Sequence, residues 1–493
     1  MTSPSPAPRP PRGALRERLR PVLAALTATA ALATGPAGGA SAAAAPPDEA
    51  TSAPEQFACP VAIADSARCY RGTDRNGSAY TLAVPTQGNG SLVVHAHGGP
   101  SLTAGSDPER SAGDLERWTV MVEEGYAWAG SSYRRGGYGT RMAAEDTESV
   151  RRVFVEQFGE PELTLLHGQS WGGNVAAKAA EVYGSADGGP FDGLLLTNGV
   201  LAGGSRGYDH RVDLRVVHQY YCRNHPRPEE TQYPLWQGLP PGETMTAADL
   251  RSRLLECTGH TLAPEDRTAL QQRNLDDITA VTGIPESSLE SHLRFATLTF
   301  SDIVHQRLEG RNPFSTVGVR YRGSHDDEAL NRGVQRFTAD RTARRDLSWD
   351  SDLTGRVSVP VLTLHAIGDP TAFVEHAAAH RATLRGAGRE RNLVQTFTRE
   401  DEHSGLSSAG YAAALDALAG WVETGRRPTP GDVARACPAF ASVHSGDCRV
   451  DPGYRPQDYH DRVNARPGGR HWPAMTAAQE TRWSRIAGVG IAP

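Results

Sequence analysis

The sequence predicts an α/β protein with a mostly parallel central sheet that is flanked by helices on both faces. Short apolar runs recur along the chain, and helical patterns separate several of them, which is typical of buried parallel strands. In addition, a serine between glycines stands between one such run and an alanine-rich helix. The predicted strands cover residues 80–84, 91–95, 126–129, 163–166, 193–197, 359–365 and 392–397.

Helical patterns separate the predicted strands and then replace them. Residues 143–158 and 175–183 are helical in pattern and lie between early strands. The alternation stops over residues 201–346, where most patterns are amphipathic helices and one begins with a capping-box-like signal at Thr246. We interpret 201–346 as a helical insertion between two strands. Because open α/β sheets bind ligands beyond the carboxyl ends of their strands, we expect it to fold over the site as a lid.

The N-terminal residues are typical of a secretory signal. Five arginines lie within the first 20 residues, an almost uncharged apolar stretch covers 22–33, and small residues at 40–42 form a cleavage pattern. The stretch is too short for a membrane span. We predict a signal peptide over 1–42 with cleavage near Ala42, and a secreted, extracellular protein without stable membrane insertion. Residues 43–56 are small and polar, which predicts a disordered leader.

Charge and cysteine content limit the partners that the sequence predicts. The formal net charge is −6, so the chain has no general electrostatic attraction for nucleic acid. We find no dinucleotide fingerprint, no phosphate-binding loop and no cysteine cluster with metal-ligand spacing, and expect neither a cofactor nor a metal. An even number of cysteines in an exported chain favours disulfides. Neighbouring cysteines predict the pairs Cys59–Cys69, Cys222–Cys257 and Cys437–Cys448.

Ser170 is the predicted nucleophile. It is the central residue of GQSWG at 168–172, which lies between the strand at 163–166 and the helix at 175–183. In this context a G-x-S-x-G sequence forms a nucleophile elbow, and small residues relieve crowding where the chain reverses. A second G-x-S-x-G is centred on Ser205. It abuts no predicted strand and opens no amphipathic helix, so we interpret it as a chance match.

A serine nucleophile needs a base within hydrogen-bond reach and an acid that orients the base. Asp369 follows the strand at 359–365 in a glycine-containing turn, and His403 follows the strand at 392–397. Both lie one loop beyond a strand's carboxyl end, where open α/β sheets place their sites. We therefore predict that His403 is the base and Asp369 the acid. The alternative acids are the three neighbours of His403, which are Glu400, Asp401 and Glu402.

The reaction of a serine nucleophile also needs donors for the oxyanion that develops. The strand at 91–95 leads into His97, Gly98, Gly99 and Pro100. One oxyanion N–H normally comes from this loop and the other from the residue after the nucleophile. We assign Gly99, with Gly98 as the alternative, together with Trp171. For His97 the sequence leaves two roles open, as a ligand or base and as a packing residue beneath the loop.

HGG at 97–99, GQSWG at 168–172, Asp369 and His403 together resemble the α/β-hydrolase superfamily, in its order of serine, acid and histidine. The resemblance covers about 70–200 and 347–425. It implies an α/β-hydrolase fold whose core has two parts, before and after the insertion. We place the domains at 57–200 (core, first part), 201–346 (helical lid insertion), 347–430 (core, second part) and 431–493 (a disulfide-stapled C-terminal extension).

The resemblance implies a secreted serine hydrolase that cleaves a carboxylic ester through an acyl-enzyme. HGGP and GQSWGG are also similar to secreted prolyl and tripeptidyl aminopeptidases, whose glycine-rich arginine motif is loosely echoed at 133–138. A serine peptidase acting on short peptides is therefore the alternative. The second alternative is a non-catalytic binding protein on the same scaffold. The expected partner is a small-molecule ester or a short peptide, in a pocket shaped by Tyr221 and Trp236 of the insertion.

Overall fold

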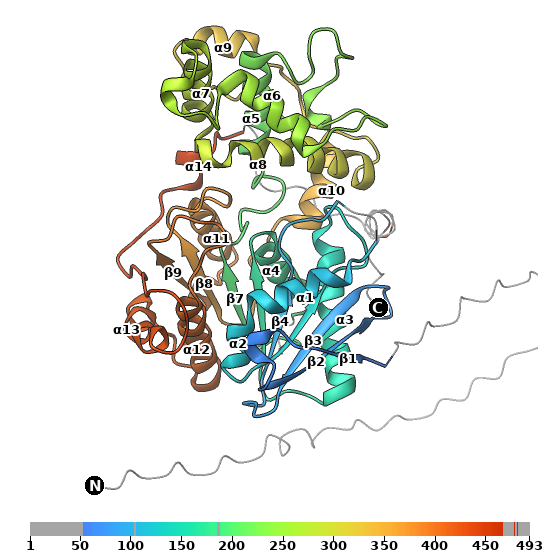
Figure 1. The fold of residues 1–493 in the computed structure, drawn as a ribbon, viewed down its shortest axis with the longest axis vertical. Coiled ribbons are helices and arrows are strands. Elements are labelled where there is room, and N and C mark those ends of the chain that lie inside the picture. Colours follow the sequence, from blue (N-terminus) through green and yellow to red (C-terminus); the bar gives the residue numbers. More distant parts are fainter. Residues whose placement is uncertain (1–52, 103–104, 185–187, 467–477, 479–480, 482–493) are drawn as a thin grey trace, which may run out of the picture. The chain divides into compact units, whose positions relative to one another are not determined.

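One twisted sheet runs through the described part of the chain (Figure 1). The computed structural model describes residues 53–102, 105–184, 188–466, 478 and 481. The predicted signal peptide at 1–42 lies outside these residues, as does most of the predicted leader. No helix in the described ranges combines the length and the apolar character that a bilayer crossing requires.

The sheet has nine strands in the order β1-β2-β3-β5-β4-β6-β7-β8-β9. Its first four strands pair in antiparallel fashion, and the pairs from β5 to β9 are all parallel. Every predicted run overlaps a strand, which confirms the mostly parallel sheet. The strands are β1 (Glu55–Phe57), β2 (Ala67–Thr73), β3 (Ala79–Pro85), β4 (Leu92–Ala96), β5 (Ala127–Ser131), β6 (Thr164–Gln169), β7 (Gly193–Thr197), β8 (Val361–Ala366) and β9 (Leu393–Thr398).

Alternate side chains of the central strands enter two separate apolar cores. Leu166 and Leu194 belong to one core, and their neighbours Leu165 and Leu195 belong to the other. Both faces of these strands are buried under helices, so their sequences are apolar throughout. Helices of the first face are α3 (Thr140–Phe158), α4 (Trp171–Tyr183) and α11 (Glu375–Gly386). Those of the second face are α1 (Pro108–Arg117), α2 (Thr119–Glu123), α12 (Ser408–Thr424) and α13 (Pro430–Ala441).

The predicted disordered leader is wrong at its C-terminal end. Glu55 and Gln56 belong to β1 and pair with Arg71 and Tyr70 of β2. The adjacent Phe57 packs against the second core, and the disulfide from Cys59 to β2 tethers this segment to the sheet. A disulfide and an apolar anchor just beyond the leader thus order residues whose own composition is polar.

The segment between β7 and β8 is helical, as the sequence predicts. In Figure 1 most of its helices lie together at the top of the view, beyond the carboxyl ends of the parallel strands, whereas the last one, Arg341–Ser351, lies lower and nearer the sheet. After α8 the chain remains helical through two π-helical turns, Phe295–Thr299 and Asp302–Arg307. The α-helices of the segment are α5 (Asp209–Cys222), α6 (Ala247–Thr258), α7 (Ala269–Thr282), α8 (Leu289–Arg294), α9 (Asp327–Gly333) and α10 (Arg341–Ser351).

Two of the predicted domain boundaries need correction. The boundary at residue 346 falls inside α10, whose Asp350 accepts hydrogen bonds from the Thr140 and Arg141 N–H groups at the start of α3. This helix therefore packs on the core. The C-terminal extension from residue 431 contains most of α13, and Val433 and Cys437 are buried in the second core. Its first helix is thus part of the core.

Residues after α13 return to the helical insertion. The short helix α14 (Tyr459–Arg462) lies beside α11, and the Tyr459 hydroxyl donates to the Arg206 carbonyl oxygen at 2.9 Å. Further along, Arg466 forms an ion pair of 2.7 Å with Asp213 of α5. The described end of the chain therefore fastens the insertion to the core.

All three predicted disulfides are present: Cys59–Cys69, Cys222–Cys257 and Cys437–Cys448. Cys222 ends α5 and Cys257 lies near the end of α6, so this disulfide joins the first two α-helices of the insertion.

Removing this disulfide is expected to destabilise the protein. A crosslink restricts the unfolded chain more when it closes a longer loop, and the two cysteines are 35 residues apart. Replacing Cys222 and Cys257 together by serine should lower the free energy of unfolding by about 2–4 kcal/mol, as measured by denaturant unfolding. Replacing Cys437 and Cys448 opens a loop of separation 11 and should cost less. An unchanged midpoint for the first pair would contradict this prediction.

Candidate active site

Ser170 stands at a sharp turn between β6 and α4. Its φ of 61° and ψ of −127° are a combination that side-chain-bearing residues rarely adopt, which is typical of strained functional positions. The turn leaves no room for a side chain at position 172. A Cβ on Gly172 would collide with Ala96 O and lie 2.8 Å from His97 O. A Cβ on Gly173 would lie 2.9 Å from Gly199 Cα. The small residues therefore allow the serine loop to pack against neighbouring backbone.

The structure brings the three predicted catalytic side chains together. His403 Nε2 lies 2.7 Å from Ser170 Oγ, and His403 Nδ1 lies 2.8 and 3.0 Å from the two Asp369 carboxylate oxygens. Asp369 is buried, whereas the other two residues are partly exposed. With the proton on Nδ1 directed at Asp369, the free Nε2 lone pair is available to accept the serine proton.

Backbone groups hold the Asp369 carboxylate in place. The N–H groups of Thr371 and Ala372 both donate to its Oδ1, at 2.8 and 2.9 Å. His365 lies close by but donates from Nε2 to the Ala372 carbonyl oxygen at 2.7 Å. The acid is therefore fixed by its own turn and directs both oxygens toward His403.

The histidine loop is held by two amide side chains that sequence reasoning missed. Gln169 Nε2 and Asn198 Nδ2 donate to the His403 carbonyl oxygen at 2.9 and 2.7 Å. Asn198 follows β7 with a φ of 44°, and its Oδ1 accepts the Ala366 N–H at 2.8 Å. Two features of the sequence could have indicated this role. Gln169 lies inside the G-x-S-x-G sequence, and Asn198 lies at the carboxyl end of a strand.

The predicted oxyanion donors lie beside the serine. A Cβ on Gly98 would lie 2.7 Å from Gln169 O and 3.4 Å from Ser170 Cβ, so this loop packs directly on the elbow. Gly99 has a φ of 64°, which glycine adopts at no steric cost. Trp171 is the first residue of α4, where N–H groups have no acceptor inside the helix. Its N–H and those of both glycines donate to no described residue.

Arg110 of α1 fixes the orientation of the glycine loop. Its Nη2 donates to the carbonyl oxygens of Gly98 and Gly99, at 2.8 and 2.9 Å. The Gly98 oxygen and the Gly99 N–H belong to one trans peptide plane and point in opposite directions. By holding this oxygen, Arg110 determines the direction of the Gly99 N–H. Sequence reasoning missed Arg110, because no local pattern links it to the loop.

The order of these loops along the chain decides the fold family. The glycine loop follows β4, the nucleophile follows β6, the acid follows β8 and the histidine follows β9. All lie at the carboxyl edge of one parallel sheet, with an elbow at the serine and the sequence order serine, acid, histidine. The chain has the α/β-hydrolase fold.

Comparisons with solved structures find distant likenesses to this α/β-hydrolase fold. Feruloyl esterase B from Aspergillus oryzae matches with a TM-score of 0.39 and 15% identity, over 78% of this chain and 89% of that one. Lipase A from Candida antarctica, in its closed state, matches with a TM-score of 0.40 and 12% identity, over 90% of both chains. Our fold assignment rests on the strand order and the loop order above.

Sequence comparisons find one curated relative. The chain is 30% identical over 111 residues to o-phthalyl amidase from Xanthobacter agilis. This match covers 22% of the present chain and 23% of the amidase, so it spans about a quarter of that relative. No known family model matches the sequence.

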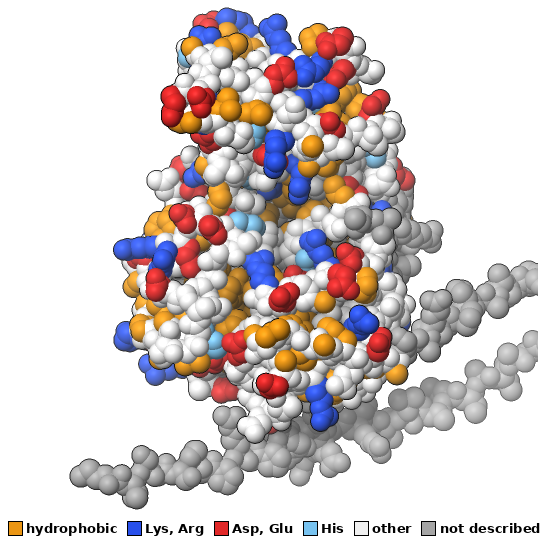
Figure 2. Space-filling view, in the orientation of Figure 1, with side chains coloured by type: hydrophobic (Ala, Val, Ile, Leu, Met, Phe, Trp, Pro, Cys, Tyr) orange, Lys and Arg blue, Asp and Glu red, His pale blue; other side chains and the backbone are white. Residues whose placement is uncertain are grey.

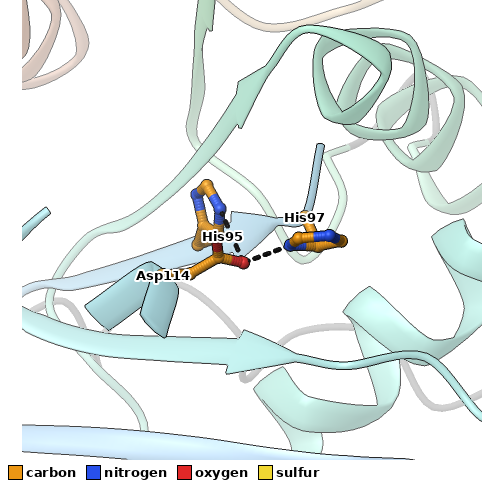
Figure 3. Close-up of side chains that lie close together, drawn as sticks. All are labelled: His95, His97 and Asp114. Carbon is orange, nitrogen blue, oxygen red and sulfur yellow. Dashed lines mark hydrogen bonds and ion pairs between the residues drawn. The ribbon is translucent and has the colours of Figure 1, made fainter. Parts of the chain in front are cut away.

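Behind the glycine loop of this α/β hydrolase fold, His95 and His97 both direct a ring nitrogen toward Asp114 (Figure 3). His97 Nδ1 is hydrogen-bonded to Asp114, and His97 Nε2 accepts from Arg110 Nε. Because the arginine can only donate, His97 is neutral and carries its proton on Nδ1. Burial lowers the pKa of His97, although the hydrogen bond to Asp114 opposes this shift. The lowered pKa favours the same neutral form.

These three side chains have a donor set that could hold a metal ion. However, both ring nitrogens of His97 are already engaged, one of them by the cationic Arg110. His95 Nδ1 is hydrogen-bonded to His167 Nδ1 at 2.9 Å. Burial would raise the pKa of Asp114, but hydrogen bonds from both histidines outweigh it and hold this pKa below its ordinary value. We interpret the group as a network that braces Arg110, which answers the open question about His97.

The alternative candidates from the sequence occupy other positions. The Ser205 hydroxyl bonds to the carboxylate of Asp352, and its N–H donates to the same carboxylate at 2.8 Å. Glu400 accepts the Ser407 N–H at 3.0 Å, while Asp401 is exposed. In the described residues neither acid bonds to the His403 ring. Among the described acids, Asp369 is the one that bonds to the imidazole.

The helical insertion reaches the acid loop and the elbow. His292 of α8 donates from Nε2 to the carbonyl oxygen of Pro370, the residue after Asp369, at 2.9 Å. On the elbow side, the Tyr208 ring lies 5.7 Å from the Tyr138 ring, which in turn lies 5.5 Å from the Trp171 ring, measured between centroids.

The aromatic residues expected to shape the pocket pack elsewhere. Tyr221 contacts Tyr220 and His325, with ring centroids 4.9 and 6.2 Å apart, in the apolar core of the insertion. Trp236 packs against the first core of the sheet. Both rings thus pack against apolar cores. Among the described residues, neither ring contacts Ser170, Asp369 or His403.

Proposed function

We propose that the protein is a serine hydrolase that cleaves a carboxylic ester through an acyl-enzyme intermediate. The observation that supports this most is the hydrogen-bonded chain from Asp369 through His403 to Ser170 Oγ. In such a chain a serine hydroxyl becomes nucleophilic because its proton has an acceptor in the correct orientation.

The proposed reaction begins when Ser170 Oγ attacks the ester carbonyl carbon and His403 Nε2 takes the hydroxyl proton. The negative oxygen of the tetrahedral intermediate accepts hydrogen bonds from the N–H groups of Trp171 and Gly99, with Gly98 as the alternative. His403 then gives its proton to the leaving alcohol. In the second half of the reaction His403 takes a proton from water as the water attacks the acyl carbon. His403 then returns this proton to Ser170 Oγ, and the acid product leaves. Asp369 holds the imidazole and stabilises its cationic form.

Amide cleavage is the second candidate function. The same steps release an amine instead of an alcohol, and the partial match to o-phthalyl amidase favours this candidate. A panel of nitrophenyl esters beside aminoacyl and tripeptidyl nitroanilides separates the two. We expect faster turnover of esters. Faster turnover of anilides would identify an amidase or peptidase, and hydrolysis of neither would overturn the proposed function.

We further propose that the protein is exported and that the insertion is a lid. The three disulfides support export, since they persist in oxidising compartments. The contact of His292 with Pro370 supports a lid above the site. Figure 2 shows the surface hollowed between the helical insertion and the sheet-bearing part of the chain, with cationic side chains and histidines around the hollow.

Arg110 is expected to act as a positioning residue for the oxyanion donors. Arg110→Met keeps much of the side-chain volume but frees the Gly98 and Gly99 oxygens, so the Gly99 N–H loses its fixed direction. We expect kcat on a nitrophenyl ester to fall about 10–100-fold with a smaller change in KM, since this N–H binds the transition state more than the substrate. Glu116→Gln, at an exposed position of the same helix, is the control. An unchanged kcat for Arg110→Met would contradict this role.

A further inference from the structure

Arg211 is a buried cation on α5, the first helix of the insertion. Its side chain is sandwiched by aromatic rings, with the guanidinium carbon 5.0 Å from the Tyr208 ring centroid and 4.1 Å from that of Phe295. Its Nε donates to His292 Nδ1 at 3.0 Å. Only 4% of the residue is exposed. Two aromatic rings and one hydrogen bond therefore hold this arginine in place.

Arg211 has no acidic partner among the described residues, in contrast to Arg466 and Arg134. Arg466 pairs with Asp213 at 2.7 Å, and Arg134 pairs with Glu145 at 2.8 Å. Among the described residues no carboxylate lies within ion-pair distance of Arg211, and its two terminal amino groups donate to none of them. Burial lowers the pKa of Arg211 to about 10, so the group stays protonated at neutral pH. A buried, unpaired charge is costly unless a partner arrives.

Two series of contacts connect Arg211 to the loops that carry the proposed catalytic residues. Its partner His292 bonds to Pro370, which follows Asp369. Its other neighbour, Tyr208, contacts Tyr138, whose ring packs on that of Trp171 beside the nucleophile. The charge of Asp369 is near enough to act on Arg211 through space, although the two do not pair.

We propose that Arg211 binds a carboxylate carried by the substrate, so that the enzyme selects acidic esters over neutral ones. A guanidinium presents parallel N–H donors that match a carboxylate in a bidentate pair, and such a pair is strengthened in a buried site. A single carboxylate neutralises the single cation. A phosphate dianion would leave an excess negative charge near Asp369. The inference rests on the proposed hydrolase function and names its substrate class.

Matched substrates test this selection. The first pair is 4-nitrophenyl hydrogen glutarate and 4-nitrophenyl methyl glutarate, which differ only in a carboxylate on the acyl side. The second pair is the butyrate ester of 4-hydroxybenzoate and that of its methyl ester, which places the carboxylate on the leaving group. We expect kcat/KM to favour the acidic member at least about tenfold in one pair, and that pair identifies the side on which Arg211 acts.

Variants of Arg211 attribute the preference to this residue. Arg211→Gln should reduce the acidic-to-neutral ratio to about one or below, and Arg211→Lys should keep part of it, because lysine retains charge without the planar fork. The ratio is internal to each preparation, so partial unfolding does not change it. Arg215→Gln is the matched control, since Arg215 is also buried on α5 but donates to the His225 carbonyl oxygen and the Tyr233 hydroxyl. Its ratio should equal that of the wild type.

A measurement without variants covers the case in which Arg211→Gln does not fold. Glutarate should inhibit hydrolysis of the neutral ester competitively in the wild-type protein, and glutaramide should not. Ser170-dependent hydrolysis of neutral esters without any acidic preference or glutarate inhibition would overturn this inference and leave the hydrolase proposal standing. A lack of hydrolysis of all four esters would overturn both.

Discussion

Replacing Ser170 by alanine is expected to lower kcat/KM on a nitrophenyl ester at least about a thousandfold. The substitution removes the oxygen that lies 2.7 Å from His403 Nε2, and no acyl-enzyme can form without it. Alanine is smaller than serine and creates no clash at the turn, so the fold should persist. Steady-state kinetics on both proteins measure the loss, and circular dichroism verifies that the variant is folded.

The second G-x-S-x-G sequence provides the matched control. Ser205→Ala removes a hydroxyl that bonds to Asp352, away from the His403 imidazole. We expect a modest loss of stability, on the order of 1 kcal/mol, and activity within a few-fold of the wild type. If Ser170→Ala kept its activity while Ser205→Ala lost it, the nucleophile assignment would be wrong.

Asp369→Asn is expected to lower kcat by about 10⁴-fold, the loss that this substitution gives in other serine–histidine–aspartate triads. An asparagine amide can keep the hydrogen bonds from Thr371 and Ala372 but presents an N–H₂ group to His403 Nδ1. The imidazole must then accept at Nδ1 and carry its proton on Nε2. In that tautomer Nε2 is unable to take the serine proton.

Measurements on the neighbouring acid separate this effect from a general charge effect. Asp401 is exposed and lies two residues before His403, so Asp401→Asn removes a similar charge nearby without touching the imidazole. We expect activity close to that of the wild type. Equal losses in the two variants would mean that net charge, and not the orientation of His403, accounts for the role of Asp369.

The core strands and the candidate triad could be predicted because both depend on local sequence. Strands such as β6 and β7 are buried on both faces, so each is a short apolar run with no polar interruption. The strand β2 alternates buried and exposed residues and includes charged ones, and β1 has only three residues. These two strands are ordered by their pairing partners and by the Cys59–Cys69 disulfide, which no apolar run indicates.

The residues that orient the site depend on contacts distant in sequence. Asn198 holds the His403 carbonyl oxygen across 205 positions, and Arg211 bonds to His292 across 81. Arg110 reaches the glycine loop because α1 packs beside β3 and β5. An isolated arginine or asparagine is most often a surface residue. Its role becomes visible only when folding determines what lies beside it.

The central claim is that Ser170 is a nucleophile activated by His403, and active-site labelling tests it most directly. A fluorophosphonate reacts with a serine only when a base activates the hydroxyl, and peptide mass spectrometry then locates the adduct. We predict one adduct per chain, on the peptide that contains Ser170, with loss of esterase activity in proportion to labelling. The adduct should be absent from Ser170→Ala and present in Ser205→Ala. An adduct on Ser205 or another residue, or full hydrolysis after Ser170 is labelled, would contradict the account.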